Sequence, residues 1–146
     1  MAFEIVLLKS FVNQRFYILI GDGNSWNTSL QNNLWGFTKG SKGLWNTSQI
    51  GDSLAFYVTS PIKRIVGFGI IKKKFISEDI IWPDEKLFRK SIWKYKLEFE
   101  KIYVVDKWMN GISLPSNIIL NSGRKVINKQ LFDSFIFEAK NKWNKE

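Results

Sequence analysis

The stretch from Ile50 to Ile71, IGDSLAFYVTSPIKRIVGFGII, indicates the fold more clearly than any other part of the sequence. Residues 53–59 carry apolar side chains at every second position, which predicts a half-buried strand. Residues 65–71 predict a second strand, in which Gly67 and Gly69 share one face. Glycines on one face allow close approach of another backbone, a bulge or sharp coiling of the strand. A small closed β-barrel would use such a strand.

Further strands are predicted on both sides of this segment. Residues 15–20 are mainly aromatic and β-branched and end at a glycine-containing turn, and residues 3–8 resemble a strand without an assigned place in the fold. Residues 94–104 alternate between a core face and a solvent face that includes Lys96. Residues 78–90 are acidic and lack a sustained period, so we interpret them as a long loop.

Helices are predicted near the first strand and at the end of the chain. A short helix from Trp26 to Asn33 has Asn24 or Ser25 as its candidate N-cap, and Asn128 is the candidate N-cap of a C-terminal amphipathic helix. The apolar face of that second helix comprises Leu131, Phe132, Phe135, Ile136, Ala139 and Trp143. Five or six strands with such helices predict an α+β barrel-like fold, with residues 1–146 forming a single domain.

The residue composition excludes several classes of chemistry. The chain contains no Cys and no His, which excludes thiolate or imidazole zinc sites, cysteine nucleophiles and imidazole acid–base catalysis. The carboxylates of Asp79, Asp84 and Glu85 lack metal-binding or acid–base spacing, so we interpret them as solvated loop residues. The Gly40–Gly43 segment lacks the pattern of a P-loop. We therefore expect no metal, no cofactor and no enzymatic activity.

The N-terminal residues and the hydropathy favour a cytoplasmic protein. The first residues lack the basic segment and long apolar run of a signal peptide. The longest purely apolar stretches are a few residues, far short of the roughly 20 needed to cross a bilayer. We expect no association with a membrane.

The chain is strongly basic, with 22 Lys and Arg against 13 Asp and Glu and a net charge of +9. The excess is concentrated in residues 62–75 and residues 107–146. Such a field attracts phosphate backbones and anionic surfaces, but charge of this sign also serves solubility alone. Charge by itself therefore leaves both interpretations open.

Three patches of sequence, taken in order, resemble the EVE family of small archaeal and bacterial proteins and the related YTH domains. Both families have PUA-like folds. The patches together span residues 16–106. They are Phe16–Ile20 with Asn24-Ser25-Trp26 and Asn33–Phe37, then Ile50–Val58 with Ile65–Gly69, then Trp93–Phe99 with Val104–Asp106. The resemblance implies a small β-barrel flanked by helices, with an aromatic-walled pocket for one nucleobase, which is often modified.

The resemblance also implies which residues form the pocket. Trp35 matches the position of one cage tryptophan, and Trp82 and Trp93 lie in the segments that supply the other cage aromatics. Asn24 and Ser25 occupy the turn that would make polar contacts to the base edge, with no acidic residue beside them as in some relatives. Taken alone, each tryptophan is more often a core residue than a ligand platform.

Several cations are candidate phosphate contacts, because Lys and Arg bind phosphates without reading sequence. For most of them a solvated surface position is an equally good interpretation. Arg124 and Lys125 are included because related domains place a basic loop in this segment. The candidates are Lys39, Lys42, Lys72, Lys73, Lys74, Arg124 and Lys125.

The leading hypothesis is a non-catalytic reader of a modified or flipped-out base in DNA or RNA. Enclosing an unstacked base between aromatic faces restores roughly 1–3 kcal/mol per stacked base. A protein partner in restriction, repair or RNA processing is expected from the frequent fusions of the family. The alternative is a protein-interaction module with a tryptophan-rich surface. An enzyme that acts on nucleotides ranks last.

Overall fold

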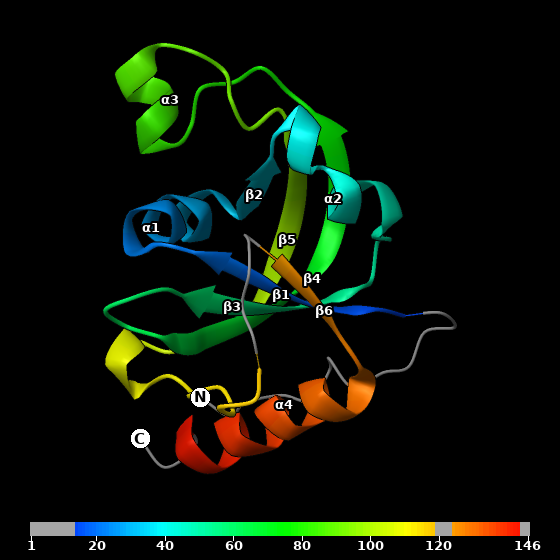
Figure 1. Cartoon of the computed structure of the whole chain (residues 1–146), viewed down its shortest axis with the longest axis vertical. Helices are drawn as coiled ribbons and strands as arrows, with labels where there is room; N and C mark the ends of the chain where they lie inside the picture. Colours follow the sequence, from blue (N-terminus) through cyan, green and yellow to red (C-terminus); the bar gives the residue numbers. More distant parts are fainter. Residues whose placement is uncertain (1–13, 119–123, 144–146) are drawn as a thin grey trace.

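The computed structural model describes residues 14–118 and 124–143, in which six strands form one curled, half-barrel sheet (Figure 1). The strand order is β2-β5-β4-β3-β1-β6; β1 and β3 are parallel, and the other neighbours are antiparallel. The strands are β1 (Phe16–Gly21), β2 (Leu34–Phe37), β3 (Ser53–Val58), β4 (Arg64–Ile76), β5 (Tyr95–Val104) and β6 (Arg124–Ile127). The predicted strand at residues 3–8 lies outside the described residues.

Short helices occupy the connections, and one long helix closes the described part of the chain. They are α1 (Gly23–Asn32), the 3₁₀ turn η2 (Lys39–Ser41), α2 (Gly43–Thr47), α3 (Pro83–Phe88), the 3₁₀ turn η3 (Trp108–Asn110) and α4 (Lys129–Trp143). The predicted α+β architecture with a C-terminal helix is confirmed. The candidate cap is also confirmed, because Asn128 Oδ1 accepts a hydrogen bond from the Leu131 amide at 2.8 Å.

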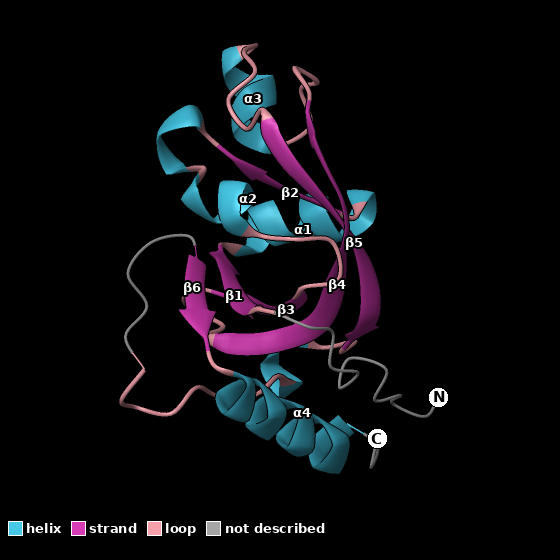
Figure 2. Ribbon diagram, turned by 90° about the vertical axis from the view of Figure 1, so that its right-hand side faces the viewer, coloured by secondary structure: helices cyan, strands magenta, loops and turns pink. Residues whose placement is uncertain are grey.

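Helices cover both sides of the sheet (Figure 2). On one side, α4 packs through Phe132, whose ring centre lies 5.1 Å from that of Phe16 and 5.6 Å from that of Phe68. On the other side, α1 packs through Trp26, whose ring centre lies 4.8 Å from that of Phe56. Because both sides are covered, every residue of β3 is buried, and the expectation of a half-buried strand at residues 53–59 is wrong.

The curl of the sheet depends on the two glycines of β4. A Cβ atom on Gly67 would lie 2.7 Å from the carbonyl oxygen of Tyr103, and one on Gly69 would lie 2.7 Å from Cζ of Phe56. Both positions therefore require glycine, as the sequence indicated. Register shifts interrupt the pairing of β4 with both of its neighbours. Such shifts increase the local bend and twist of a strand.

Two predicted boundaries are wrong for local reasons. The N-cap of α1 is Asp22, whose Oδ1 accepts from the Ser25 amide at 2.7 Å, so the helix begins before the predicted caps Asn24 and Ser25. The predicted basic loop at Arg124 and Lys125 is strand β6, which pairs with β1. Edge pairing with β1 satisfies the backbone there, and a four-residue strand leaves little periodicity to detect.

The strongest departures concern charge and burial. The predicted loop at residues 78–90 contains α3, and its Glu85 is buried rather than solvated. Lys96, expected on the solvent face of β5, is also fully buried. Alternation predicted the two faces of β5, but the segment after β4 folds over the face that was expected to be exposed.

We expect Gly67→Ala to lower the free energy of unfolding by about 1–3 kcal/mol, because the added methyl group meets the backbone of β5. Urea denaturation measures this change. Gly40→Ala is the matched control, because a Cβ atom there meets nothing within 4 Å. The control should change stability by no more than about 0.5 kcal/mol. Equal effects of the two substitutions would contradict the proposed close approach.

Candidate functional site

A cavity of about 560 Å³ opens where the edge strand β2 approaches the end of β1. These strands lie at distant positions in the sheet order, so only the curl of the sheet brings them together. The cavity is lined by Ile20, Gly21, Asp22, Ser25, Trp35, Gly36, Phe37, Thr38, Ser41, Trp82, Asp84 and Trp93. We refer to this cavity as the tryptophan pocket.

Trp35 of β2 forms the inner wall. Its side chain is only 8% exposed, and its ring stacks on that of Trp26 with the centres 4.3 Å apart and an angle of 29°. Trp26 is itself anchored by a hydrogen bond from its Nε1 to the Tyr57 carbonyl oxygen at 2.8 Å. Gly21 leaves room for the ring, because a Cβ atom there would lie 2.5 Å from Cη2 of Trp35. The wall is therefore held by the core.

Trp82 and Trp93 come from the segment between β4 and β5. Both pack beside Gly36, where a Cβ atom would lie 2.5 Å from Cβ of Trp93 and 3.0 Å from Cη2 of Trp82. Trp82 Nε1 donates to Ser29 Oγ at 2.9 Å, which ties its ring to α1. Trp93 Nε1 donates to Asp84 Oδ2 at 2.8 Å. Each indole orientation is thus set by a hydrogen bond.

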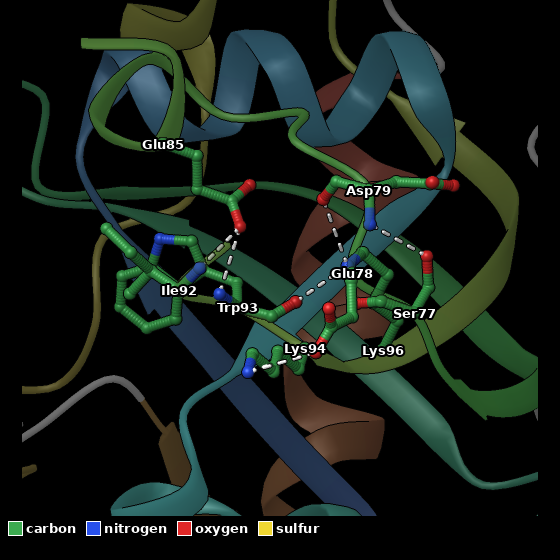
Figure 3. A network of polar contacts seen from close by, with 8 residues as sticks. All are labelled: Ser77, Glu78, Asp79, Glu85, Ile92, Trp93, Lys94 and Lys96. Atoms are coloured by element: carbon green, nitrogen blue, oxygen red, sulfur yellow. Dashed lines mark hydrogen bonds and ion pairs between the residues drawn. The ribbon is translucent and has the colours of Figure 1, made fainter. Parts of the chain in front are cut away.

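The carboxylate of Glu85 holds this segment in shape (Figure 3). Its Oε1 accepts from the amides of Ile81 and Trp82 at 3.0 and 3.1 Å, and its Oε2 accepts from those of Ile92 and Trp93 at 2.8 and 3.1 Å. Burial alone raises the pKa of Glu85, but these four amides outweigh it and leave the pKa below its ordinary value. The charged side chain therefore ties both ends of the segment around α3.

Lys96 makes the second buried polar contact to the segment. Its Nζ donates to the carbonyl oxygens of Ser77 and Trp93, each at 2.8 Å (Figure 3). Burial lowers the pKa of Lys96, and the negative charges of Glu85 and Asp79 act against that shift. One cation and one carboxylate thus satisfy backbone groups on both sides of Trp93.

The structure brings together most of the predicted pocket residues. Trp35, Trp82, Trp93 and Ser25 all line the tryptophan pocket, but Asn24 does not. Adjacent helical residues point about 100° apart, so Asn24 and Ser25 of α1 face different sides.

Two carboxylates line the pocket without belonging to any sequence motif, so the sequence did not predict them as site residues. Asp22 and Asp84 both line the pocket, so the expectation that no acidic residue lies beside the polar turn is wrong. Asp22 follows strand β1 directly and precedes a helix, which is the position that favours an N-cap carboxylate. That position is the signal that identifies it. The expectation that Asp84 is a solvated loop residue is wrong, because it lies in α3, is half-buried and accepts two hydrogen bonds.

Of the candidate phosphate contacts, two lie next to residues that line the pocket. Lys39 and Lys42 lie beside the pocket residues Thr38 and Ser41, and Lys42 Nζ lies 4.5 Å from the ring centre of Tyr95.

The lysines of β4 are engaged in other contacts. Lys74 Nζ donates to the carbonyl oxygens of Trp45 and Ser48, each at 2.7 Å. Lys72 pairs with Glu98 at 3.7 Å, and Lys73 lies over the Phe75 ring. Lys74 therefore has a structural role in holding α2. The backbones of Arg124 and Lys125 lie in β6 on the opposite edge of the sheet from β2.

Residues 14–118 and 124–143 hold no group of three or more His, Cys, Asp or Glu side chains arranged to bind a metal ion. None of their helices has the length and apolar character needed to cross a membrane.

Comparison with known proteins reveals likeness in structure. No protein-family model matches the sequence, and no curated protein matches it. The Pho92 YTH domain, solved with N6-methyladenosine, is similar with a TM-score of 0.61 and 20% identity over 91% of this chain and 90% of that one. The YTH domain of Zygosaccharomyces rouxii MRB1, solved with N6-methyladenosine RNA, has a TM-score of 0.59 and 18% identity over 88% of each chain.

ASCH domains share the same architecture. A mutant of the ASCH protein of Zymomonas mobilis is similar with a TM-score of 0.62 and 7% identity over 86% of this chain and 97% of that one. The fold is therefore the PUA-like fold of YTH and ASCH domains. Membership of the EVE family stays a prediction.

We expect Glu85→Gln to lower the free energy of unfolding at pH 7 by about 2–3 kcal/mol, because the amide nitrogen leaves buried backbone donors unsatisfied. Chemical denaturation followed by tryptophan fluorescence measures the change. Glu78→Gln is the matched control. Its side chain is 78% exposed and pairs with Lys94 on the surface, so removal of its charge should cost at most about 1 kcal/mol.

Comparison of the native protein with Glu85→Gln across a range of pH tests the lowered pKa of Glu85. A carboxyl whose folded pKa lies below its unfolded value stabilises the fold above the unfolded pKa, which is about 4.3. That stabilisation is lost as the pH falls through the folded pKa. The native protein should therefore lose more stability below about pH 4 than Glu85→Gln does. Parallel pH profiles would contradict the assignment.

Proposed function

We propose that this protein binds nucleic acid by holding one flipped-out, modified base in the tryptophan pocket. The observation that carries the proposal is the convergence of Trp35, Trp82 and Trp93, from separate segments of the chain, on one cavity. The cavity of about 560 Å³ lies within the range of small-molecule sites, roughly 300–1,000 Å³. Aromatic faces suit every base, because each base has a π-face.

The pocket has the preformed geometry that base recognition requires. Trp35 is stacked on the core, Trp82 is bonded to α1, and Trp93 is bonded to Asp84, so little ordering is needed on binding. Beside the aromatic walls, the hydroxyl group of Ser25 is placed to contact the base edge, whereas the Ser41 hydroxyl is bonded to Thr38. The site thus combines stacking surfaces with polar groups.

RNA is the favoured partner. One YTH domain that shares the fold of this chain was solved with N6-methyladenosine RNA, and another was solved with N6-methyladenosine. RNA is also read mainly in single-stranded segments whose bases can be splayed out onto aromatic side chains. A base extruded from DNA would fit the same pocket, so RNA and DNA oligonucleotides are measured separately in the binding test.

A non-catalytic role is part of the proposal. The sequence has neither His nor Cys, and both pocket carboxylates already make structural hydrogen bonds. Asp22 caps α1, and Asp84 orients the Trp93 indole. These contacts favour binding over turnover.

We expect Trp93→Ala to weaken binding of a modified RNA oligonucleotide by at least about tenfold, because one stacking face is lost at about 1–3 kcal/mol. Fluorescence anisotropy with a panel of modified and unmodified RNA and DNA oligonucleotides measures this. Trp35→Ala should abolish binding, with circular dichroism to check that the fold persists. Trp108→Ala is the matched control, because Trp108 lines a separate groove.

Unchanged affinity in both pocket variants would contradict the assignment of the pocket. Weak binding that ignores modification, together with a polypeptide that co-purifies, would favour the protein-interaction alternative instead. Turnover of any nucleoside in the panel would overturn the non-catalytic role.

We expect phosphate contacts from Lys39 and Lys42, because both flank the pocket residues of η2. The double variant Lys39→Ala/Lys42→Ala should weaken binding to all oligonucleotides alike and reduce the slope of log affinity against log salt by about 1–2. Lys107→Ala/Lys140→Ala removes the same charge elsewhere and should leave the slope near its native value. Equal slopes for the two double variants would contradict this placement.

A further inference from the structure

The tryptophan pocket is acidic although the chain as a whole is strongly basic. The net charge is +9, yet the charged side chains that line the pocket are the carboxylates of Asp22 and Asp84, and none of the described Lys or Arg residues lines it. Lys39 and Lys42, which can attract phosphates, therefore lie beside a cavity whose own carboxylates repel them. This contrast separates two parts of a ligand, an anionic backbone outside and a group of different charge inside.

Asp22 lines the pocket, is exposed, and uses only one of its carboxylate oxygens in a protein hydrogen bond. Its Oδ1 accepts from the Ser25 amide at 2.7 Å, while Oδ2 has no hydrogen-bond partner among residues 14–118 and 124–143. Its negative charge is neutralised by no ion pair within the same ranges. A carboxylate offers acceptors only, so it favours a ligand edge that carries N–H donors or positive charge.

Asp84 adds a second negative charge to the same pocket. Its Oδ1 accepts from the Glu85 amide and its Oδ2 accepts from Trp93 Nε1, each at 2.8 Å. Both donors are neutral, so these hydrogen bonds orient the carboxylate without cancelling its charge. Because an indole N–H lies in the plane of its ring, this contact places the charge at the edge of the Trp93 ring.

The aromatic walls favour the same kind of ligand. The ring faces of Trp attract cations through the ring quadrupole, most strongly where the site is shielded from water. Trp35 and Trp82 are 8% and 4% exposed, so these walls are largely shielded. The Trp82 ring already has Lys96 Nζ 5.8 Å from its centre, so the two carboxylates act on a flat, positively charged group together with Trp35 and Trp93.

Resting on the proposed function, we infer that the tryptophan pocket selects a nucleobase that carries a positive charge from methylation of a ring nitrogen. Asp22 is the specificity-determining residue, and Asp84 both positions Trp93 and adds to the field. A neutral base of the same size that presents an acceptor to Asp22 fits the aromatic walls but gains nothing from the carboxylates. Discrimination thus depends on charge rather than on size.

Isomeric bases test this inference, because they have the same composition and differ in charge. Near pH 6.5, 1-methyladenosine is cationic while N6-methyladenosine is neutral, and 3-methylcytidine is cationic while N4-methylcytidine is neutral. Each base is placed once in the same RNA oligonucleotide, and anisotropy gives the affinity. We expect the native protein to bind the cationic member of each pair at least tenfold more tightly.

Conservative variants then assign the preference to the carboxylates. Asp22→Asn removes the charge but keeps a good N-cap for α1, so the preference for the cationic isomer should fall at least fivefold while the fold is retained. Asp84→Asn keeps an acceptor for Trp93 and should lower the preference in the same direction. Asp106→Asn is the matched control, because Asp106 lines the separate groove near Trp108.

The outcomes distinguish this inference from the proposed function. Equal affinity for both isomers, with both lost in Trp93→Ala, overturns the charge preference and leaves base binding in place. A preference unchanged in both Asp22→Asn and Asp84→Asn also overturns it. Absence of binding to every oligonucleotide overturns the proposed function and the inference together.

Discussion

The packing of the Phe56 ring against Gly67 and Gly69 is the contact on which the rest of the structure depends. It draws β3 and β4 into the curl that brings the distant strands β1 and β2 to one cavity. The same ring lies 4.8 Å from that of Trp26, which in turn stacks on Trp35. An aromatic chain thus runs from the centre of the sheet to the wall of the pocket. Because interiors are close-packed, the position of the wall follows from the core.

The opposite wall is built on a different principle. The segment between β4 and β5 has few core contacts, and a buried carboxylate and a buried ammonium group satisfy its backbone. Burying a charged group costs roughly several kcal/mol per ion unless protein hydrogen bonds replace those it made to water. Glu85 and Lys96 make seven such contacts between them, four by the carboxylate and three by the ammonium. The pocket therefore has one wall held by packing and one held by polar contacts.

Local patterns identified much of the fold and part of the site. The alternating apolar side chains and the two glycines of residues 53–71 predicted the central strands. The helical spacing of apolar residues predicted the buried face of α4. Trp35 came from a resemblance that the shared fold supports. Patterns failed at Glu85 and Lys96, because a charged residue within an acidic loop or an alternating strand is normally solvated. Their burial depends on partners that lie far away in the sequence or on backbone groups, which no periodicity reveals.

Composition and hydrophobic periodicity were enough to predict a basic chain with an α+β fold and no thiol or imidazole side chains, because both are local properties of the sequence. The tertiary structure decided that three tryptophans meet in one pocket and that the pocket is acidic. Asp22 caps α1 and Asp84 lies in α3, far away in the chain, so only the curl of the sheet places both charges at one site. The electrostatic field in a pocket depends on the charged groups that lie close to it in space, not on the net charge of the chain. For this reason a basic chain can contain an acidic pocket.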